Sequence, residues 1–455
     1  MSPQLHRRQM LKRAAAAGAG IWLAGRGHRA QHGRGWAGTV SANEKLNIAV
    51  VGCGGQGGEN LKQVAGENIV ALCDVDESRA AGALQQFPAA AKFRDFRRMF
   101  DRMQKQIDAV VVSTPDHMHA PVSLAAMRLG KHVYCEKPLT WSIEEARLMA
   151  RTAQAQKVAT QMGTQGMAGD RSRAGVEVVA SGVLGEVTEL HVWTDRAANW
   201  WPQGVERPKE TPPVPKGLDW DLWLGVAPER PYHPAYVPFA WRGWEDFGTG
   251  AVGDMGIHNA AMPFVGLQLG RPKSAEIVQT SGLTRETFPA WSTLRIELPS
   301  GGGHRAQHGR SSITLFWYDG GKKPSADLIG GREVAANGAI VVGKNATLYS
   351  IEWTGGDWLL LPEEKFRDYK PPEPTLPRAP GQSHHQEWIR ACKGGPPTFC
   401  GFEGFAAVLT EIMLVGNLAL RTGKKIEWNA AKMEANQCPE AEPFVKRRYR
   451  KGWEI

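Results

Sequence analysis

Residues 48–57 read Ile48-Ala-Val-Val-Gly-Cys-Gly-Gly-Gln-Gly57, an apolar run that breaks into the pattern G-x-G-x-x-G. This order predicts a strand, a tight turn and a helix whose N-terminus can hold a phosphate group. Gly52 permits the turn, Gly54 lets the backbone approach the phosphate, and Gly57 lets the helix pack close to the strand. The stretch therefore predicts a loop that binds the pyrophosphate of a dinucleotide.

A second apolar run, residues 69–73, ends in Asp74, about 20 residues after the glycines. A carboxylate at this position can accept hydrogen bonds from the adenine ribose hydroxyls. It would repel a 2′-phosphate, so the sequence favours NAD over NADP as the cofactor. A glycine-rich turn without a ligand is the alternative, and the order of strand, glycines, helix and acid argues against it.

Two kinds of sequence pattern divide the chain. Residues 44–161 alternate apolar strand runs with amphipathic helical segments, which predicts an α/β domain of the Rossmann type with a doubly wound parallel sheet. Residues 162–455 contain longer alternating strands, which predicts an α+β domain with a mostly antiparallel open sheet. We expect two C-terminal helices, 383–392 and 405–421, to pack at the junction of the domains.

The N-terminal segment predicts export. Arg7-Arg8 precede Gln-Met-Leu-Lys12, and an apolar segment rich in Ala and Gly follows, with no acidic residue before Glu44. This pattern is typical of a twin-arginine signal, so we expect residues 1–38 to be signal and linker and the mature protein to be periplasmic or otherwise exported. A Sec signal or a retained anchor is the alternative. The apolar segment is shorter than the about 20 residues that a membrane span needs, and no span is expected later.

The charge distribution argues against nucleic-acid binding, and the cysteines are not expected to form disulfides. Seven of the nine net positive charges come from residues 1–38, which hold seven Lys and Arg and no acid. The remainder carries only +2, so we expect no nucleic-acid partner. The six cysteines are interpreted as small apolar core residues rather than disulfides, because folding would finish in a reducing compartment.

One octamer, Gly27-His-Arg-Ala-Gln-His-Gly-Arg34, recurs unchanged as residues 303–310. We interpret both copies as inserted repeats that are tolerated in loops. Metal binding through the two histidines of each copy is the alternative, because their spacing suits one helix face. The same octamer in a signal region and a hairpin indicates duplication instead, and we expect no metal site.

Two loops at the ends of the fourth and fifth predicted strands carry polar residues, Ser113-Thr-Pro-Asp-His-Met-His119 and Glu136-Lys137-Pro138. Ligands bind outside the carboxyl ends of such strands, so both loops should face the dinucleotide. Lys137 can donate to a substrate oxygen or to the nicotinamide ribose, and a surface lysine is the alternative. The residues expected to bind the dinucleotide are Gly52, Gly54, Gly55, Gln56, Gly57, Asp74, Thr114, Pro115, His119, Glu136 and Lys137.

In the second half, a glycine-rich stretch leads into Asp254-Met-Gly-Ile-His258. A spacing of four puts Asp254 and His258 on one helix face, close enough to interact. The carboxylate can fix the tautomer and orientation of the imidazole, which leaves the other ring nitrogen to take the proton of a substrate hydroxyl. A capped or solvated helix start is the alternative.

Together these elements resemble the glucose-fructose oxidoreductase and inositol dehydrogenase family, Gfo/Idh/MocA. The resemblance covers nearly the whole chain after the signal region, and the combination of motifs is more specific than any one of them. It implies that Lys137, Asp254 and His258 take the places of the family's catalytic lysine, aspartate and histidine. It also implies that the open sheet of the second domain mediates a homodimer or a homotetramer.

Seven of the 17 tryptophans fall between Trp193 and Trp244. Indole faces suit the apolar C–H faces of sugar rings, and the indole N–H can bond to hydroxyls. We expect Trp200, Trp201 and Arg242, together with His258, to contact a carbohydrate substrate. Packing in the core is the alternative for at least half of these tryptophans.

The sequence therefore predicts an exported NAD(P)-dependent oxidoreductase that transfers hydride to or from a hydroxyl carbon of a sugar or sugar derivative. His258 would act as base or acid, Asp254 would orient it, and Lys137 would stabilise the developing alkoxide. The resemblance also implies an alternative, an NAD-dependent glycoside hydrolase that works by transient oxidation and elimination. A non-catalytic sugar-binding protein is the second alternative, and the presence of both Lys137 and His258 argues against it.

Overall fold

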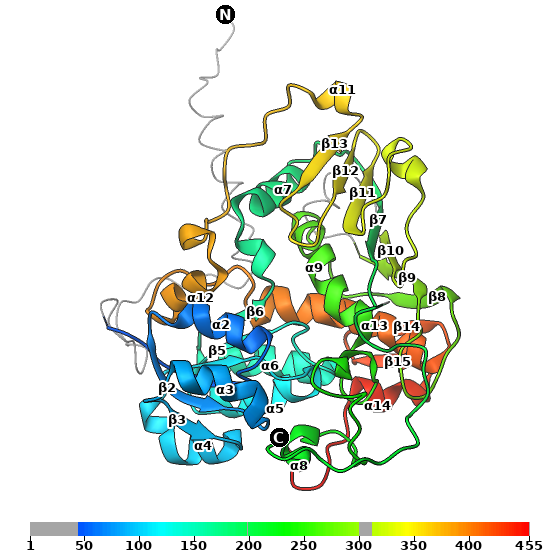
Figure 1. Ribbon diagram of the computed structural model, residues 1–455. Helices are drawn as coiled ribbons and strands as arrows, with labels where there is room; N and C mark the ends of the chain where they lie inside the picture. The colour runs from blue at the N-terminus through cyan, green and yellow to red at the C-terminus, as the bar shows by residue number, and fades with distance from the viewer. Residues whose placement is uncertain (1–43, 198, 300–311, 455) are drawn as a thin grey trace, which may run out of the picture.

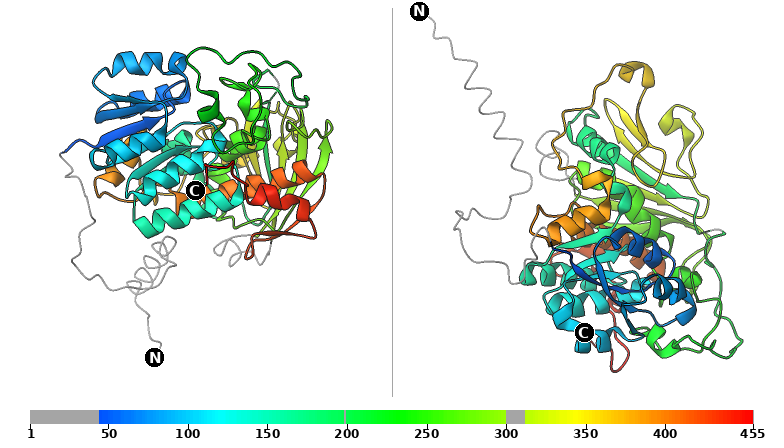
Figure 2. Two further views of the ribbon diagram at one scale, coloured as in Figure 1. Left: turned by 90° about the horizontal axis from the view of Figure 1, so that it is seen from below. Right: turned by 60° about the vertical axis from the view of Figure 1, so that its left-hand side comes forward.

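The computed structural model describes residues 44–197, 199–299 and 312–454. Two sheets organise this part of the chain, one of six strands and one of nine. The two views in Figure 2 show them in separate lobes that lie side by side, with the helices of the first domain on both faces of its sheet. The expected signal segment and both copies of the octamer lie outside the described residues.

The first sheet is parallel throughout, with the strand order β3-β2-β1-β4-β5-β6. Alternate side chains of its central strand enter two different apolar clusters, because helices cover both faces of the sheet. Its elements are β1 (Asn47–Val51), α2 (Gln56–Val64), β2 (Asn68–Cys73), α3 (Glu77–Gln86), β3 (Ala91–Phe93), α4 (Phe96–Met103), β4 (Ala109–Val112), α5 (Asp116–Arg128), β5 (His132–Glu136), α6 (Ile143–Gln156) and β6 (Thr160–Gly163).

This sheet confirms the predicted doubly wound fold, with two additions. β6 continues to Gly163, past the domain boundary expected at residue 161. The helix α12 (His384–Cys392) lies far away in the sequence but packs against α2 and β6 (Figure 1). Its residues Trp388 and Ile389 join the apolar cluster that contains Ile48. The first domain is therefore completed by a helix from the C-terminal part of the chain.

The second sheet has the order β13-β12-β11-β7-β10-β9-β8-β14-β15. All its pairs are antiparallel except β7 with β10, which confirms the predicted α+β domain. Its strands are β7 (Val187–Thr194), β8 (Ser274–Thr280), β9 (Ser292–Leu298), β10 (Ile313–Tyr318), β11 (Asn337–Gly343), β12 (Thr347–Ser350), β13 (Trp358–Leu361), β14 (Ile426–Asn429) and β15 (Glu434–Asn436). The helices are α7 (Asp170–Ala180), α8 (Trp220–Leu224), α9 (Gly250–Gly266), α11 (Glu363–Phe366), α13 (Ala407–Thr422) and α14 (Glu442–Val445).

Helix α9 is the central element of the second domain and packs against β7, β11, α7 and α13. Of its residues only His258 and Val265 are not fully buried. His258 is partly exposed because it lines the cavity that is described below.

The segment Phe402–Thr422, which includes α13, is long and apolar enough to cross a membrane by length and composition. However, 83% of its most apolar part is buried, and α13 packs between α6 and α9. It is therefore the core helix that joins the domains, as expected for residues 405–421.

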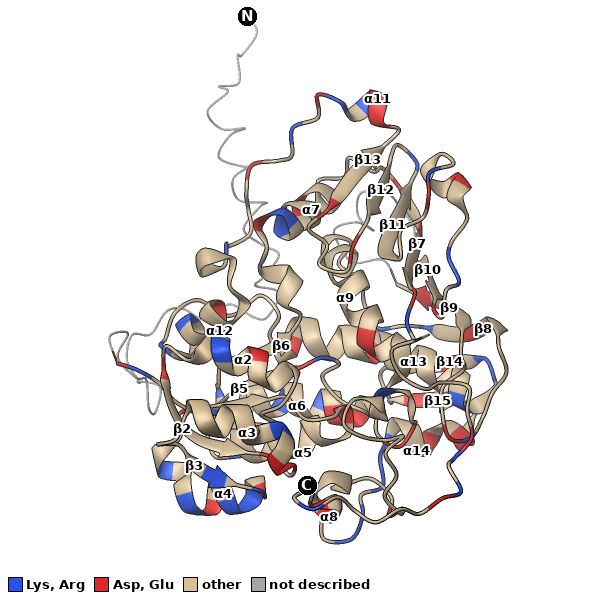
Figure 3. Cartoon of the chain, in the orientation of Figure 1, with Lys and Arg blue, Asp and Glu red and all other residues tan. Residues whose placement is uncertain are grey.

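All six cysteines are buried and unpaired, which agrees with their interpretation as core residues. Figure 3 shows positions of Lys and Arg and positions of Asp and Glu spread over the described chain, with several Lys or Arg positions on α4.

We predict that Gly57→Ala destabilises the first domain, because an added Cβ would lie 1.9 Å from the carbonyl oxygen of Gly52. Overpacking of this kind costs about 1–3 kcal/mol. The matched control is Gly82→Ala in α3, where an added Cβ meets nothing within 4 Å and should stabilise the helix by about 0.5–1 kcal/mol. Thermal unfolding of the two variants checks this, and an equal or higher Tm for Gly57→Ala would contradict it.

Candidate active site

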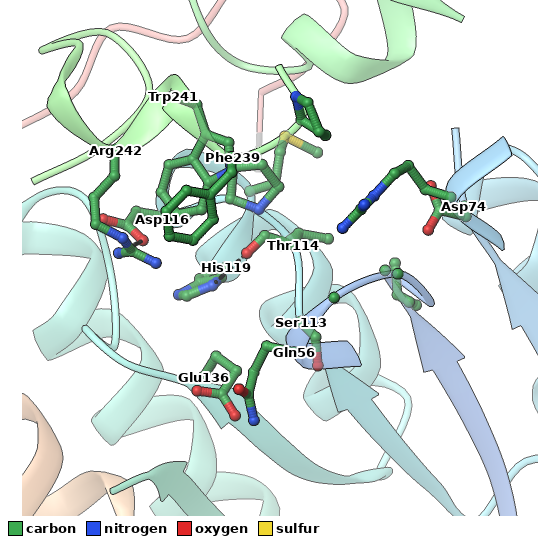
Figure 4. A pocket seen from close by; sticks show the side chains of 18 of the residues that line it. Gln56, Asp74, Ser113, Thr114, Asp116, His119, Glu136, Phe239, Trp241 and Arg242 are labelled. Carbon is green, nitrogen blue, oxygen red and sulfur yellow. Dashed lines mark hydrogen bonds and ion pairs between the residues drawn. The ribbon is translucent and has the colours of Figure 1, made fainter. Parts of the chain in front are cut away.

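A cavity of about 450 Å³ lies at the C-terminal ends of the first sheet's strands and is closed by α9 and neighbouring loops. Figure 4 shows Asp74 at one end of it and Asp116 with Arg242 at the other. Its walls contain most of the residues that were predicted to act together. Of the predicted residues, the lining includes Gly52, Gly54, Gly55, Gln56, Asp74, Thr114, Pro115, His119, Glu136, Lys137, Trp200, Arg242, Asp254 and His258.

The glycine loop has the shape that a pyrophosphate needs. Gly52 has a φ of 83°, and a Cβ on it would lie 2.6 Å from the carbonyl oxygen of Ser113. Helix α2 starts at Gln56, and no side chain caps its N-terminal N–H groups. Gly57 does not line the cavity, because its role is the close packing of α2 on the loop. The loop therefore leaves bare backbone and uncapped N–H groups facing the cavity.

Asp74 fixes the glycine loop to the end of β2. Its carboxylate accepts hydrogen bonds from the N–H of Cys53 at 2.7 Å and the N–H of Asp76 at 3.0 Å. Burial raises the pKa of Asp74, and these two N–H donors oppose the increase. Nearby, the Thr114 hydroxyl is buried and has no partner in the described chain, although it belongs to a cavity wall. The bare glycines, Asp74 and this orphaned hydroxyl fit a bound dinucleotide.

A segment of the second domain covers the Asp74 end of the cavity. We call residues 217–241 the strap. Its Gly217 carbonyl accepts from the N–H of Glu77 at 3.2 Å, and the N–H of Asp219 donates to the carbonyl of Val75 at 2.9 Å. Several strap residues and Trp453 line the cavity. The end of the site that should hold adenosine is therefore covered by segments from the second domain.

The carboxylate of Asp254 is the centre of a buried charge network. Lys137 Nζ donates to it at 2.5 Å and Arg196 Nη1 at 3.2 Å, while Arg242 Nε lies 3.4 Å away. Asp254 is only 1% exposed. Burial alone would raise its pKa, but Arg242, Lys137 and Arg196 hold the pKa of Asp254 well below its usual range. Asp254 therefore stays ionised and fixes the position of the Lys137 ammonium group.

Arg242 extends this network to the other domain. It lies on the short helix Ala240–Gly243, and its Nη1 donates to Asp116 at 3.2 Å (Figure 4). Thr249 donates to the same carboxylate at 2.6 Å, and the Arg242 guanidinium lies 4.3 Å from the ring centre of Trp241. Arg242 is only 8% exposed. Arg242 therefore contacts two carboxylates, Asp116 of the first domain and Asp254 of α9, and links α9 to the first domain.

His258 faces the cavity without a hydrogen bond to any residue that the structure describes. Its burial, together with the charge of Lys137, lowers the pKa of His258 to about 3. From the spacing of the two residues we expected Asp254 to orient this imidazole. The structure has no hydrogen bond between these two side chains, and the Asp254 oxygens accept from Lys137 and Arg196 instead. That expectation is corrected: Asp254 orients Lys137, and His258 stays available to a ligand.

Two of the residues predicted to bind the cofactor shape the loops around it. The ring nitrogens of His119 lie 2.8 Å from the carbonyl oxygens of Pro138 and Thr114. This side chain therefore ties the loop after β4 to the loop that carries Lys137. The Oε1 atom of Glu136 accepts hydrogen bonds from Asn60 at 2.9 Å and Gln165 at 2.8 Å. Burial raises the pKa of Glu136.

The two adjacent tryptophans of the predicted substrate site point to different places. Trp200 is 48% exposed, lines the cavity, and lies 3.9 Å below the Arg196 guanidinium. Trp201 is only 6% exposed, does not line the cavity, and its indole N–H donates to Gln203. The expectation for Trp201 is therefore corrected, because its side chain belongs to the core.

Gln165, Arg196 and Trp353 are among the cavity residues that the sequence did not single out. Arg196 lies two residues after the end of β7, so its position near the end of a strand was the only available signal. Trp353 lies in the loop between β12 and β13, and Gln165 lies in a short turn after β6. No local pattern marks either of them.

Two family models match the chain. The model of the Gfo/Idh/MocA oxidoreductase family with an NAD-binding Rossmann fold matches residues 46–164, and the model of that family's C-terminal alpha/beta domain matches residues 171–278. An inositol 2-dehydrogenase of Rubrobacter xylanophilus is 34% identical over 157 residues, which are 33% of this chain and 44% of that protein. A glycosyl hydrolase family 109 protein of Solibacter usitatus is 35% identical over 163 residues, 33% of this chain and 36% of that protein. These matches span less than half of either relative.

Solved structures resemble the fold over most of the chain. The WlbA dehydrogenase from Bordetella pertussis in complex with NADH and UDP-GlcNAcA has a TM-score of 0.57 and 16% identity, over 85% of this chain and 99% of that chain. GenD2 from gentamicin A biosynthesis in complex with NAD has a TM-score of 0.56 and 18% identity, over 89% of this chain and 100% of that chain. At these identities the similarity concerns the fold.

We predict that Asp254→Asn lowers the free energy of unfolding by about 3–5 kcal/mol, because it leaves three cations without their shared carboxylate. Glu59→Gln is the control, since Glu59 and Lys62 form an exposed pair that contributes less than about 1 kcal/mol. Urea unfolding at neutral pH measures both. Equal losses in the two variants would show that the network contributes little.

Proposed function

The chain belongs to the Gfo/Idh/MocA oxidoreductase family, and on this premise we propose that it is an NAD-dependent enzyme acting on a CH–OH group of a sugar or sugar derivative. The observation that carries the proposal is one cavity that joins the glycine loop to Lys137, Asp254 and His258. A bound nicotinamide ring supplies an acceptor or donor of hydride for the hydroxyl-bearing carbon. The chain's own residues must then bind the nucleotide and handle the hydroxyl proton.

Several residues are arranged to hold the nucleotide. The backbone of Gly54, Gly55 and Gln56 would receive the pyrophosphate, because this part of the loop is bare and its N–H groups are uncapped. Asp74 stands where it can accept from the adenine ribose. The orphaned Thr114 hydroxyl offers a further polar contact in the same cavity.

His258 would exchange a proton with the substrate hydroxyl. Its imidazole is neutral at neutral pH, because burial and Lys137 hold its pKa at about 3, and no described residue occupies its ring nitrogens. The Lys137 ammonium, held by Asp254, would stabilise negative charge that develops on the substrate oxygen. The base and the cation come from different domains, so the reaction requires the contact between the domains that Lys137 and Asp254 make.

Glycoside cleavage by transient oxidation and elimination is the second candidate function. Two observations favour it. Some curated relatives are named glycosyl hydrolase family 109 proteins, and the strap covers the Asp74 end of the cavity. A covered cofactor suits a reaction that leaves it unchanged after each turnover. The same residues would serve, with His258 or Lys137 handling the protons.

One experiment separates these functions. The purified protein is analysed for its bound nucleotide and then screened with free sugars and glycosides. Absorbance of the reduced nicotinamide and release of the aglycone are followed together. Accumulation of reduced cofactor indicates net oxidation, whereas aglycone release without it indicates cleavage. A folded protein that retains no nucleotide and acts on none of these compounds would contradict both proposals.

We also propose export by the twin-arginine route, which is supported by Arg7-Arg8 and the apolar segment that follows them. This route carries folded proteins, so the cofactor would be acquired before export.

Assembly through the open sheet of the second domain, as a homodimer or homotetramer, is supported by the family resemblance. Fractionation of cells that express an Arg7→Lys/Arg8→Lys variant, and the mass of the assembly in solution, test these two proposals.

We predict that His258→Gln binds NAD normally but loses about 10²–10⁴-fold in kcat, because general base or acid catalysis contributes this much. His191→Gln is the control, since His191 lies in the second sheet and outside the cavity. Calorimetric titration with NAD and steady-state rates measure the two effects. Normal turnover by His258→Gln would remove His258 from the mechanism.

We predict that His258 stays neutral from pH 8 to below pH 5, because its pKa is lowered to about 3 by burial and then by Lys137. Activity that requires the neutral base should therefore show no acid limb near pH 6.5 from this group. In Lys137→Met the pKa of His258 should rise, since one repelling charge is gone. NMR titration of labelled histidines, assigned with His258→Gln, checks both, and a wild-type pKa near 6.5 would contradict the account.

A further inference from the structure

One cavity residue has an exposed apolar side chain directly beside the proposed base. Trp353 lies in the loop of residues 351–357 between β12 and β13, and its ring centre is 5.1 Å from that of His258. The two ring planes are nearly perpendicular, at 74°. Trp353 is 39% exposed although it is one of the largest apolar side chains of the protein. It also lies outside the segments that match the two family models.

The loop that carries Trp353 is held firmly. The N–H of Ile351 donates to the carbonyl of Asp357 at 2.9 Å, and the Ser172 hydroxyl donates to the carbonyl of Thr354 at 3.0 Å. The loop also packs on Gly166, where a Cβ would lie 2.6 Å from the backbone of Thr354. These contacts fix the position of the loop, so the loop holds the indole of Trp353 at the cavity wall with part of its surface exposed.

A second exposed indole is linked to the same charge network. Trp200 is 48% exposed and lies beneath Arg196, whose Nη1 donates to Asp254. Trp353 stands beside the base, and Trp200 stands beside a cation that shares the carboxylate of Lys137. Both indoles come from the second domain, and both line the cavity that holds the glycine loop.

We propose that Trp353 is the platform on which the reacting sugar ring stacks, and that Trp200 receives the group attached to that ring, so that the site selects glycosides over free monosaccharides. The inference rests on the proposed function, because it takes His258 as the group that meets the reacting hydroxyl. A sugar ring has apolar C–H faces and a rim of hydroxyls. The exposed indole can contact the apolar face of the ring, and the neighbouring imidazole can accept a proton from a hydroxyl on its rim.

The role of Trp353 is tested with Trp353→Ala and Trp353→Phe. We expect Trp353→Ala to raise KM for every accepted sugar roughly tenfold, with a smaller change in kcat and an unchanged NAD content. Trp353→Phe should recover most of the loss, because it restores an aromatic face. In a His258→Gln background, equilibrium titration with the substrate should show the same weakening of Kd without turnover. An unchanged Kd and KM in Trp353→Ala would overturn the proposal.

Gly166→Ala tests the role of Trp353 independently, because it should displace the loop that carries the indole and weaken sugar binding. Its added methyl group would push the backbone of Thr354 and move the loop while leaving the indole in the chain. We expect a rise in KM like that of Trp353→Ala, with NAD still bound. Trp291→Ala is the matched control, since Trp291 lies under Lys322 and outside the cavity, and its KM should match the wild type. A normal KM in Gly166→Ala together with a normal KM in Trp353→Phe and Trp353→Ala would exclude stacking at this loop.

Trp200→Ala tests the second half of the proposal. It should raise KM for a glycoside and leave KM for the corresponding free sugar unchanged, so that the preference between the two is lost. Equal effects on both ligands, or on neither, would contradict the assignment. If the wild-type protein neither binds nor converts any sugar, the proposed function fails. If the wild type is active and these tryptophan variants match it, only the present inference fails.

Discussion

The structure depends on a single buried carboxylate, Asp254, and on the three cations that surround it. A carboxylate that is 1% exposed would not stay ionised alone, and Lys137, Arg196 and Arg242 keep it charged. These cations come from the loop after β5, the loop after β7 and the short helix before α9. One negative charge therefore fixes the lysine of the first domain against the helix of the second. The surplus of positive charge also helps to keep the neighbouring imidazole of His258 neutral.

The cavity thus combines two parts with different physical origins. The nucleotide end is formed by backbone, since bare glycines and uncapped N–H groups need no side chains to receive a phosphate. The other end, which contains Lys137 and His258, is formed by charged and aromatic side chains from both domains. The strap connects the two parts, because it bonds to the turn after β2 and also leads into the helix that carries Arg242.

The sequence predicted those parts of the molecule that local patterns determine. The glycine loop, Asp74 and the two strand-end loops, one of which carries Lys137, follow from strand periodicity. The spacing of four residues marked Asp254 and His258, and the resemblance to a family then implied catalytic roles for all three. Position in a chain does not reveal which way neighbouring side chains point, so Trp200 and Trp201 could not be distinguished. Arg196 and Trp353 come from loops without a motif, and only tertiary contacts bring them to the cavity. The partnership of Asp254 with Lys137, instead of His258, likewise depends on how the two domains meet.

We infer that the charge network holds the Lys137 and His258 side chains across the cavity from a nucleotide bound at the glycine loop. A crystal structure of the protein with NAD bound would show this arrangement. We expect the pyrophosphate to lie against the backbone of residues 54–56 and the C4 atom of the nicotinamide to face His258. A nicotinamide ring turned away from His258, or a pyrophosphate bound elsewhere in the protein, would contradict it.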